Sequence, residues 1–233
     1  MFQLQSIDRR KVLANNNLDW TDYYSVIVPE VLCNDILRVG RVVDGGKWVC
    51  NPIKIRHFKE GCVIYSFGIS NELSFDEAIQ NFTQQRCVLK AIDKFKQNSD
   101  TIKQLEKIRG VFKQVEIANI TNQDKNQYSF SDVVSTFGDK RIEILKIDIE
   151  GAEYQVIDQI LSIPICQILI ETHSMKISAK KTFELIQKIA KSGFYLFAFQ
   201  INGAFHPLAE YGFIHEKCFE TYGLTTVYGR YLD

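Results

Sequence analysis

The sequence predicts an α/β fold of the Rossmann-like type, a mostly parallel seven-stranded sheet with helices on both faces. Short apolar runs that suit buried strands alternate with segments of helical periodicity along most of the chain. The clearest unit, residues 62–93, joins a strand, a glycine-containing loop, a helix and a second strand that ends on an acid. The last two predicted strands have no helix signal between them, so the sheet is expected to close with a strand pair.

The elements of the 62–93 unit follow from its residues. Residues 62–67 are an apolar run that suits a buried strand, and residues 87–92 form a second run that ends at Asp93. Between them, Ser74 and Glu77 have the spacing of a capping box, in which each side chain accepts a hydrogen bond from the other residue's amide. The apolar residues of the helix that follows lie on one face, namely Phe75, Ala78, Ile79 and Phe82.

The same alternation predicts the rest of the chain. Further strands are expected at 111–118, 142–147 and 165–170, and further helices at 101–108, after Gly151 and at 178–191. The closing strands are expected at 194–199 and 224–231, joined by a long loop. Residues 18–37 are expected to be a helical lead-in before the turn Asp44-Gly45-Gly46. We therefore expect residues 1–60 to pack, as a lead-in and turn, on a domain of residues 61–233.

Composition excludes several classes of protein. The 233 residues are 45% hydrophobic and 24% charged, which argues against a disordered chain. The 28 basic and 28 acidic residues balance, so no long-range attraction to nucleic acid is expected. No apolar run has the length of a membrane helix. The N-terminus lacks the apolar stretch of a secretory signal, so we expect an intracellular protein, cytoplasmic or organellar, unless a signal has been removed.

The six cysteines are expected to be reduced and mostly buried. They are scattered along the chain, several beside apolar runs, and a chain of this length does not need disulfides to fold. No CxxC pair is present, so a structural zinc site is not expected. The cysteines are Cys33, Cys50, Cys62, Cys87, Cys166 and Cys218.

The loop of residues 66–72 occupies the place where a doubly wound sheet binds its cofactor. It holds a single glycine, Gly68, so it lacks the G-x-G-x-x-G pattern that cradles a dinucleotide pyrophosphate. S-adenosylmethionine has no phosphate and makes a weaker demand on the loop, although the loop also suits a plain strand-to-helix turn. Asp93 stands 25 positions after Gly68, where an acid can accept hydrogen bonds from both ribose hydroxyls, although surface acids at strand ends are common.

Four segments resemble a known family. Residues 145–153, Leu-Lys-Ile-Asp-Ile-Glu-Gly-Ala-Glu, look like the signature segment of the FkbM-type methyltransferases. Residues 65–71 together with 74–76 resemble the first motif of the methyltransferase-like eukaryotic branch of that family, and residues 44–50 and 168–173 resemble further segments of the branch. The resemblance covers about residues 38 to 200.

The resemblance implies a class I methyltransferase fold, S-adenosylmethionine as methyl donor, and O-methylation of sugars or other hydroxyls. By position it assigns Asp93 to the ribose and Asp148 to a place beside the transferring methyl. The loop residues that it assigns to the methionine end of the cofactor are Ser66, Gly68, Ser70 and Asn71. Family members often carry a second glycine where this chain has Ser70, which could crowd the methionine carboxylate or hydrogen-bond it.

Acidic residues and a histidine gather where two predicted neighbouring strands end. Asp148 follows the strand of residues 142–147, and Glu171 and His173 end the next strand. His173 could act as the general base that takes a hydroxyl proton. A divalent metal held by Asp148, Glu171 and His173 is an alternative, but the spacing does not demand a metal and we expect none. Glu150 and Glu153 can be explained as complements of a helix dipole, an interpretation that we favour for Glu153.

These observations predict an S-adenosylmethionine-dependent O-methyltransferase whose partner is a hydroxyl-bearing small molecule or glycan. The alternative is a catalytically degenerate methyltransferase-like domain that serves as a structural subunit of a larger assembly. Ser70 and the absence of an obvious acceptor-binding domain keep that alternative open. A nucleotide-dependent oxidoreductase is disfavoured because the phosphate-binding loop is missing.

Overall fold

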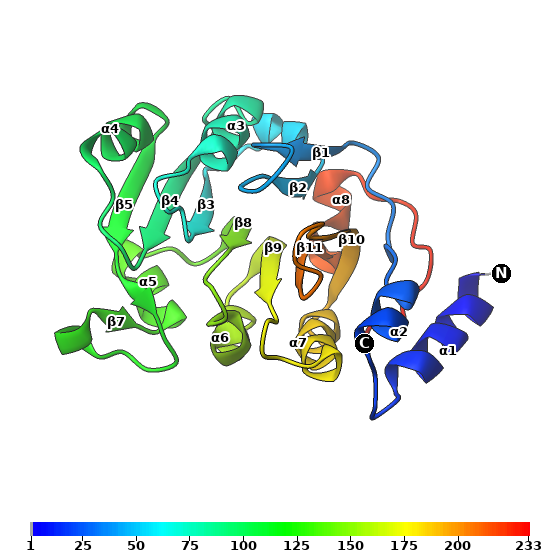
Figure 1. The fold of residues 1–233 in the computed structure, drawn as a ribbon. Coiled ribbons are helices and arrows are strands. Elements are labelled where there is room, and N and C mark those ends of the chain that lie inside the picture. Colours follow the sequence, from blue (N-terminus) through cyan, green and yellow to red (C-terminus); the bar gives the residue numbers. More distant parts are fainter. Residues whose placement is uncertain (1) are drawn as a thin grey trace.

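The computed structural model describes residues 2–233, and its centre is a seven-stranded sheet with helices on both faces (Figure 1). The strand order is β10-β11-β9-β8-β3-β4-β5. The strands from β9 to β5 are parallel, and β11 runs antiparallel to both of its neighbours. The predicted Rossmann-like fold of a class I methyltransferase is confirmed. The sheet strands are β3 Cys62–Phe67, β4 Cys87–Asp93, β5 Gly110–Gln114, β8 Ile142–Ile147, β9 Ile165–His173, β10 Phe194–Ile201 and β11 Leu208–His215.

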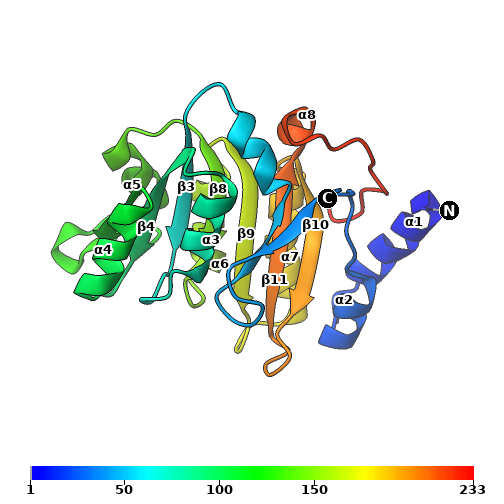
Figure 2. The same ribbon diagram turned by 90° about the horizontal axis from the view of Figure 1, so that it is seen from above.

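Helices cover the sheet in two layers. Helices α3 and α4, with the hairpin of β1 and β2, lie on one face, and α5, α6 and α7 lie on the other (Figure 1). Figure 2 shows α1 and α2 at the edge of the molecule beside β10. The helices are α1 Phe2–Leu13, α2 Trp20–Val26, α3 Ser74–Phe82, α4 Ser99–Lys107, α5 Phe130–Phe137, α6 Glu153–Ile160, α7 Ala179–Lys191 and α8 Phe219–Tyr222. The remaining short elements are β1 Ile36–Val39, β2 Lys47–Cys50, β6 Glu116–Ile117, β7 Gln127–Tyr128 and the 3-10 turns η1 Pro52–His57, η2 Gln123–Lys125 and η3 Glu216–Cys218.

Both faces of the sheet are buried, which explains why its strands are continuous apolar runs rather than alternating ones. Along β9, Ile168 and Ile170 belong to the hydrophobic cluster under α5, α6 and α7. Leu169, between them, points to the other cluster, which lies under α3 and the β1–β2 hairpin. The sheet is therefore fixed from both sides, and only its edges and strand ends are available for a site.

The last strand of the sheet was predicted in the wrong place. Residues 224–231 form no strand of the sheet, and within them Val227 makes an isolated bridge with Val31. The strand that pairs with both β9 and β10 is β11, which follows β10 after the short connection 202–207. The lead-in was also wrong in part: residues 18–37 contain the short helix α2 and the first half of β1 rather than one helical segment.

The start of α3 differs from the predicted capping box. Leu73 is the N-cap residue, and its carbonyl accepts a hydrogen bond from the Glu77 amide at 2.8 Å. The side chain that satisfies the first turn is Glu72, which accepts bonds from the Ser74 amide at 2.9 Å and the Ser74 hydroxyl at 3.0 Å. The Ser74 oxygen also accepts from the Arg41 amide at 3.2 Å, so it ties the β1–β2 turn to the helix.

The prediction of reduced cysteines is wrong. All six cysteines are paired, as Cys33–Cys50, Cys62–Cys87 and Cys166–Cys218. The residues lie far apart in sequence, but parallel pairing of β3 with β4 places Cys62 directly opposite Cys87, with their Cα atoms 4.4 Å apart. Cysteines at strand positions were expected to be packing residues. The pairing of neighbouring strands instead brings two of them close enough to form a disulfide.

None of the helices within residues 2–233 is long and apolar enough to span a membrane.

Candidate functional site

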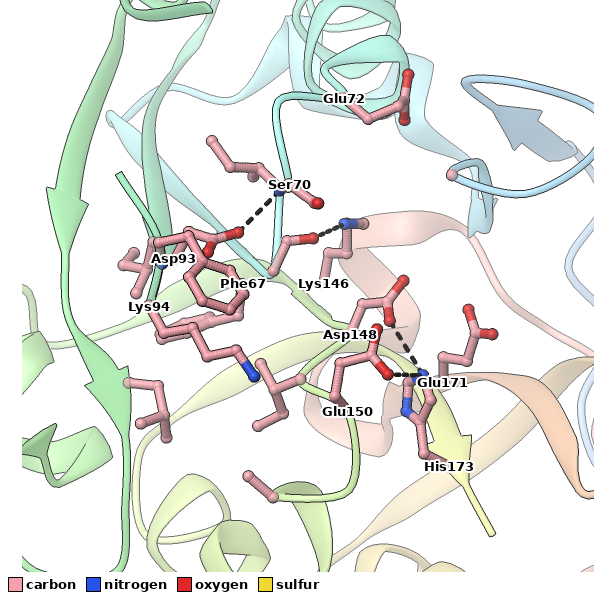
Figure 3. A pocket seen from close by; sticks show the side chains of 18 of the residues that line it. Phe67, Ser70, Glu72, Asp93, Lys94, Lys146, Asp148, Glu150, Glu171 and His173 are labelled. Carbon is pink, nitrogen blue, oxygen red and sulfur yellow. Dashed lines mark hydrogen bonds and ion pairs between the residues drawn. The ribbon is translucent and has the colours of Figure 1, made fainter. Parts of the chain in front are cut away.

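A cavity of about 730 Å³ opens at the carboxyl ends of β3, β4, β8 and β9 (Figure 3). This edge is where ligands bind in parallel α/β sheets. Apolar side chains line one part of the cavity, among them Phe95, Val115 and Ile117. Carboxylates and a histidine line the other part, among them Asp148, Glu171 and His173 as predicted. A volume of this size is typical of a site for a cofactor or another small molecule.

Gly68, which follows β3, allows the ends of β3 and β8 to come together. A Cβ atom on Gly68 would lie 1.7 Å from the Asp148 carbonyl oxygen, and the residue has a φ of +76°. No other residue can occupy this position without moving the backbone. The close approach brings the loop after β3 beside Asp148 at the floor of the cavity.

Asp93 and Ser70 meet on the β4 side of the cavity. The Ser70 amide donates to Asp93 Oδ2 at 2.8 Å, and the Phe95 amide donates to Oδ1 at 2.7 Å (Figure 3). Each carboxylate oxygen keeps a second acceptor position, which a ribose hydroxyl could use. The assignment of Asp93 to the ribose stays a prediction. Ser70 has a φ of +42°, a left-handed conformation in which the second glycine expected from the resemblance would be unstrained.

The other two residues that the resemblance assigns to the methionine end of the cofactor, Asn71 and Ser66, contact the protein itself. The Asn71 side chain accepts hydrogen bonds from the Asn98 amide at 2.8 Å and from the Thr101 hydroxyl at 3.2 Å, which joins the loop to the start of α4. Ser66 lies within β3, is fully buried and does not line the cavity. Close to it, burial raises the pKa of the Asp76 carboxyl to about 6, although the charge of Lys146 opposes the shift.

Lys47, a residue that sequence reasoning missed, is the centre of a buried ion-pair network. Its Nζ atom lies 2.6 Å from Glu171, 2.9 Å from Glu210 and 3.4 Å from Asp148. Burial alone would lower the pKa of Lys47, but the three carboxylates outweigh it and hold the pKa above its ordinary value. Glu210 also pairs with Arg38. The predicted residue Glu171 therefore faces a lysine from the Asp44-Gly45-Gly46 turn region, and burial still raises its pKa despite that lysine.

His173 is held by Glu153, which lies in the first turn of α6 and is fully buried. One Glu153 oxygen accepts from the His173 amide at 2.9 Å and lies 2.8 Å from His173 Nδ1. The other accepts from the Gly151 amide at 2.8 Å. Glu153 is thus a positioning residue for His173, and the helix-dipole interpretation does not account for it.

The second ring nitrogen of His173 points toward two further carboxylates (Figure 3). Nε2 lies 3.5 Å from Asp148 Oδ1 and 3.6 Å from Glu150 Oε2. Burial lowers the pKa of His173, but Glu153, Asp148 and Glu150 together raise it to about 9. The unliganded imidazole is therefore protonated at neutral pH, which argues against the predicted role of His173 as proton acceptor there.

Asp148 and Glu150 reach this position through an irregular stretch after β8. Glu150 has a φ of +57°, a conformation that is uncommon for residues other than glycine, and Gly151 follows with a φ of +102°. The Glu150 side chain is 70% exposed and lines the cavity. Burial raises the pKa of Asp148, but Lys47, Lys146 and His173 outweigh it and the pKa lies below its ordinary value.

Comparisons with solved structures find methyltransferases of low similarity to this chain. The fibrillarin of Aeropyrum pernix, solved with S-adenosylmethionine, is 10% identical with a TM-score of 0.44, over 80% of this chain and 87% of that chain. The precorrin-6y C5,15-methyltransferase of Geobacter metallireducens GS-15 is 8% identical with a TM-score of 0.43, over 70% and 84%. A SAM-dependent methyltransferase of Aquifex aeolicus is 10% identical with a TM-score of 0.39, over 70% and 89%. Similarities of this size say nothing about the acceptor.

A search of curated proteins finds no match to this chain. The model of a family described as "Methyltransferase domain" matches residues 3–215, which is most of the chain. The match includes the loop after β3, the end of β4 and the carboxylates that follow β8. The chain therefore belongs to the methyltransferase-domain family, and it is an enzyme with the class I fold whose cofactor is S-adenosylmethionine.

Proposed function

We propose that the protein transfers the methyl group of S-adenosylmethionine to a hydroxyl of a sugar or another small molecule. The observation that carries this proposal is the group formed by Asp148, Glu150 and His173, which faces the cavity beside the cofactor loop. An acceptor hydroxyl needs a partner that fixes its oxygen and a group that removes its proton. The residues of this polar group could both hydrogen-bond the acceptor oxygen and take its proton. The resemblance to FkbM-type methyltransferases points to the same class of acceptor.

The cofactor is expected to lie across the cavity from its apolar part to this polar group. Asp93 would accept hydrogen bonds from the ribose hydroxyls, while Gly68 and Ser70 would contact the methionine end. The adenine ring would pack near Phe95, Val115 and Ile117. This orientation would bring the sulfonium methyl toward Asp148.

The transfer itself is a displacement at the methyl carbon. The acceptor hydroxyl loses its proton to a cavity carboxylate, a new C–O bond forms, and the bond from the methyl carbon to sulfur breaks to give S-adenosylhomocysteine. Glu150 is the best placed acceptor of that proton because its carboxylate is 70% exposed and pairs with His173, whereas the more buried Asp148 pairs with both Lys47 and His173. Holding the acceptor in line with the methyl group would supply a further part of the acceleration.

The sequence left cytoplasmic and organellar compartments open, and the disulfides disfavour the cytoplasm. Three disulfides persist in an oxidising environment and are rare in the cytosol. We therefore propose that the protein works in an oxidising compartment, such as the lumen of a secretory organelle, where glycan and small-molecule hydroxyls are suitable acceptors.

The test has two steps. Calorimetry with S-adenosylhomocysteine should show one binding site, and Asp93→Ala should weaken it about tenfold or more, because a charge-assisted hydrogen bond contributes about 1.5–3 kcal/mol. A screen of sugars and small alcohols should then identify an acceptor by release of S-adenosylhomocysteine. Asp148→Asn should reduce both cofactor affinity and turnover with that acceptor.

Two outcomes would contradict the proposal. A chain that binds no S-adenosylhomocysteine would support the alternative of a degenerate domain with a structural role. A chain that binds the cofactor but methylates amines, carboxylates or nucleic acid in preference to hydroxyls would overturn the acceptor class.

A further inference from the structure

Three potential metal ligands converge at the polar end of the cavity, and they come from two separate strand ends. They are Asp148 and Glu150, in the irregular stretch after β8, and His173, at the end of β9. One donor atom from each residue lies within 4.8 Å of the other two. We propose that these three side chains bind one divalent transition-metal ion, which the spacing in the sequence did not demand.

The geometry supports a common coordination sphere. Ligand atoms at about 2.1 Å from an ion lie roughly 3.0–3.4 Å apart in octahedral or tetrahedral arrangements. His173 Nε2 is already 3.5 Å from Asp148 Oδ1 and 3.6 Å from Glu150 Oε2. Small side-chain movements would therefore complete the sphere, and Glu150, which is largely exposed, is free to make them.

The environment of His173 is that of a metal ligand. A histidine that binds a metal usually donates its other ring N–H to a carboxylate, which fixes the tautomer and the ring orientation. Glu153, fully buried, takes this place at 2.8 Å from Nδ1 and leaves Nε2 directed at the two carboxylates. The second oxygen of Glu153 is fixed by the Gly151 amide, so this support is itself rigid.

The charges around the site favour a cation. Five carboxylates form a connected network with Lys47 and Arg38. The charge of Lys146 also acts on Asp148 from outside this network, but the carboxylates still outnumber these three cations. Lys47 lies closer to Glu171 and Glu210 than to Asp148, and it contacts Asp148 through Oδ2, so Oδ1 remains directed toward His173. A dication would offset the excess negative charge. The carboxylates are Asp148, Glu150, Glu153, Glu171 and Glu210.

The donor set indicates the class of ion. Two carboxylates suit Mg²⁺ or Mn²⁺, while an imidazole favours transition metals such as Zn²⁺. Mn²⁺ and Zn²⁺ are therefore the probes to use. The role of the ion rests on the proposed function, although its binding does not. With the ion bound, Glu150 would be a ligand and no longer the proton acceptor. The ion would instead coordinate the acceptor hydroxyl, promote release of the hydroxyl proton to water, and orient the oxygen that takes the methyl group.

The test is direct titration of the whole protein, freed of metal with a chelator and then dialysed. Calorimetry with Mn²⁺ and with Zn²⁺ should show one site, and Mn²⁺ binding should also appear in electron paramagnetic resonance spectra. Glu150→Gln should weaken binding about tenfold or more, and its exposed position makes a folding defect unexpected. Asp44→Asn is the matched control, because Asp44 is an exposed carboxylate that lines the same cavity outside the ligand group.

Binding of S-adenosylhomocysteine is measured on the same samples, so that the two proposals fail separately. Cofactor binding without binding of either metal overturns the metal site and leaves the proposed function standing. The metal site is also overturned if metal affinity falls equally in Glu150→Gln and Asp44→Asn, or if it falls in neither variant. A single metal site lost only in Glu150→Gln supports it, whether or not an acceptor has been found.

Discussion

At the scale of single residues, position 68 requires glycine, because any side chain there would clash with the backbone. Gly68→Ala would place a Cβ atom 1.7 Å from the Asp148 carbonyl oxygen, so the ends of β3 and β8 would have to separate. We expect a clear loss of thermal stability and at least a tenfold loss of affinity for S-adenosylhomocysteine, measured by thermal unfolding and calorimetry.

The control for this substitution is Gly138→Ala, at the end of α5. Gly138 has nearly the same φ, +73° against +76°, but a Cβ atom there would meet nothing within 4 Å. This variant should show only the cost of the left-handed conformation, about 1–2 kcal/mol in the free energy of unfolding, with unchanged cofactor affinity. Equal defects in the two variants would mean that the contact with Asp148 is unimportant.

Asp76 gives a prediction about pH. Its carboxyl is fully buried, and burial raises its pKa to about 6. Because the folded state holds this proton more tightly than the unfolded chain, the contribution of Asp76 to stability is present below about pH 4 and is lost as the pH rises through 6. Asp76→Asn removes that loss. The stability of the variant relative to the parent should therefore rise by roughly 2–3 kcal/mol between pH 4 and pH 7.

Urea unfolding at several pH values measures this difference. Asp158→Asn, on an exposed position of α6, is the control and should follow the parent at every pH. A constant difference between Asp76→Asn and the parent across the range would show that Asp76 does not carry the effect.

The residues of the site were predictable to the extent that strand ends determine them. Asp148, Glu171 and His173 were found because parallel strands end at one edge of the sheet. Lys47 was missed because its partners lie 101, 124 and 163 positions away along the chain. The function of Glu153 was missed because a glutamate in a first helical turn is explained equally well by the helix dipole, and only tertiary structure brings it to His173.

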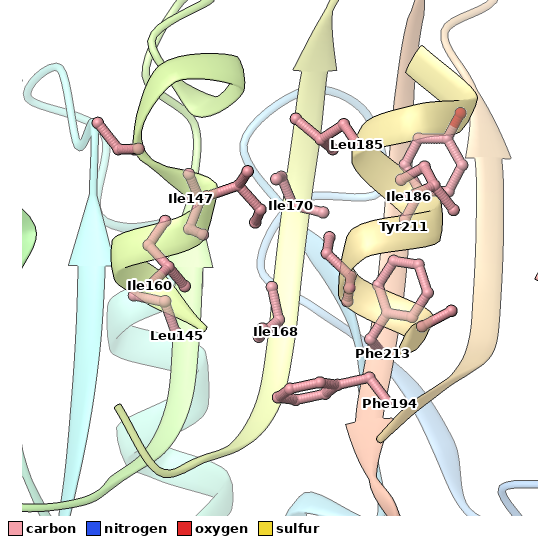
Figure 4. Close-up of a cluster of buried hydrophobic side chains, with 14 of the residues drawn as sticks. Leu145, Ile147, Ile160, Ile168, Ile170, Leu185, Ile186, Phe194, Tyr211 and Phe213 are labelled. Carbon is pink, nitrogen blue, oxygen red and sulfur yellow. The ribbon is translucent and has the colours of Figure 1, made fainter. Parts of the chain in front are cut away.

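At the scale of the elements, hydrophobic periodicity predicted the helices and strands that pack an apolar face into the core. Figure 4 shows Leu185 and Ile186 of α7 beside the sheet, and both belong to the buried hydrophobic cluster on that face. In the same cluster, Ile168 and Ile170 of β9 point toward the helices. Elements with both a strong pattern and a buried face were therefore predicted within a few residues.

Strand β11 was not predicted from the sequence because tertiary contacts, rather than a local pattern, determine its residues. Gly212 and Glu210 interrupt its apolar run and weaken the strand signal. Gly212 is required because a Cβ atom there would lie 2.7 Å from the ring of Phe197. Glu210 is required by its pairing with Arg38 and Lys47. Both reasons depend on segments that the local sequence does not contain.

The disulfide between β3 and β4 gives a prediction at this scale. Mass spectrometry of the unreduced protein should show no free thiol and a loss of two hydrogens for each of the three bridges. The double variant Cys62→Ala/Cys87→Ala should lower the free energy of unfolding by about 3–4 kcal/mol, because the bridge closes a loop of 25 positions. Reductant should lower the unfolding midpoint of the parent. Alkylation of all six cysteines without reductant would contradict the pairing.

At the scale of the whole molecule, the two ends of the chain are joined to the sheet through one buried carboxylate. Glu30 lies in the segment between α2 and β1 and is fully buried. It accepts hydrogen bonds from the amides of Tyr231 and Leu232 at 2.7 and 3.0 Å, and from the amide of Leu196 in β10 at 3.2 Å. The backbone carbonyl of Glu30 accepts from the Tyr228 amide at 2.7 Å. The C-terminal segment, expected to be a strand, is instead held against the N-terminal segment by these bonds.

Glu30→Ala should therefore loosen the end of the chain as a unit. Three buried amides would lose their acceptor, at roughly 1–3 kcal/mol each, so we expect the free energy of unfolding to fall by about 3 kcal/mol or more. Hydrogen exchange should accelerate most at Tyr231 and Leu232, before global unfolding, while amides of β3 and β8 keep their protection. Glu30→Gln, which keeps one acceptor oxygen, should lie between the parent and the alanine variant, and Glu220→Ala on the exposed side of α8 should match the parent. If exchange in Glu30→Ala rises uniformly over the sheet, the carboxylate stabilises the whole core rather than the junction of the two ends.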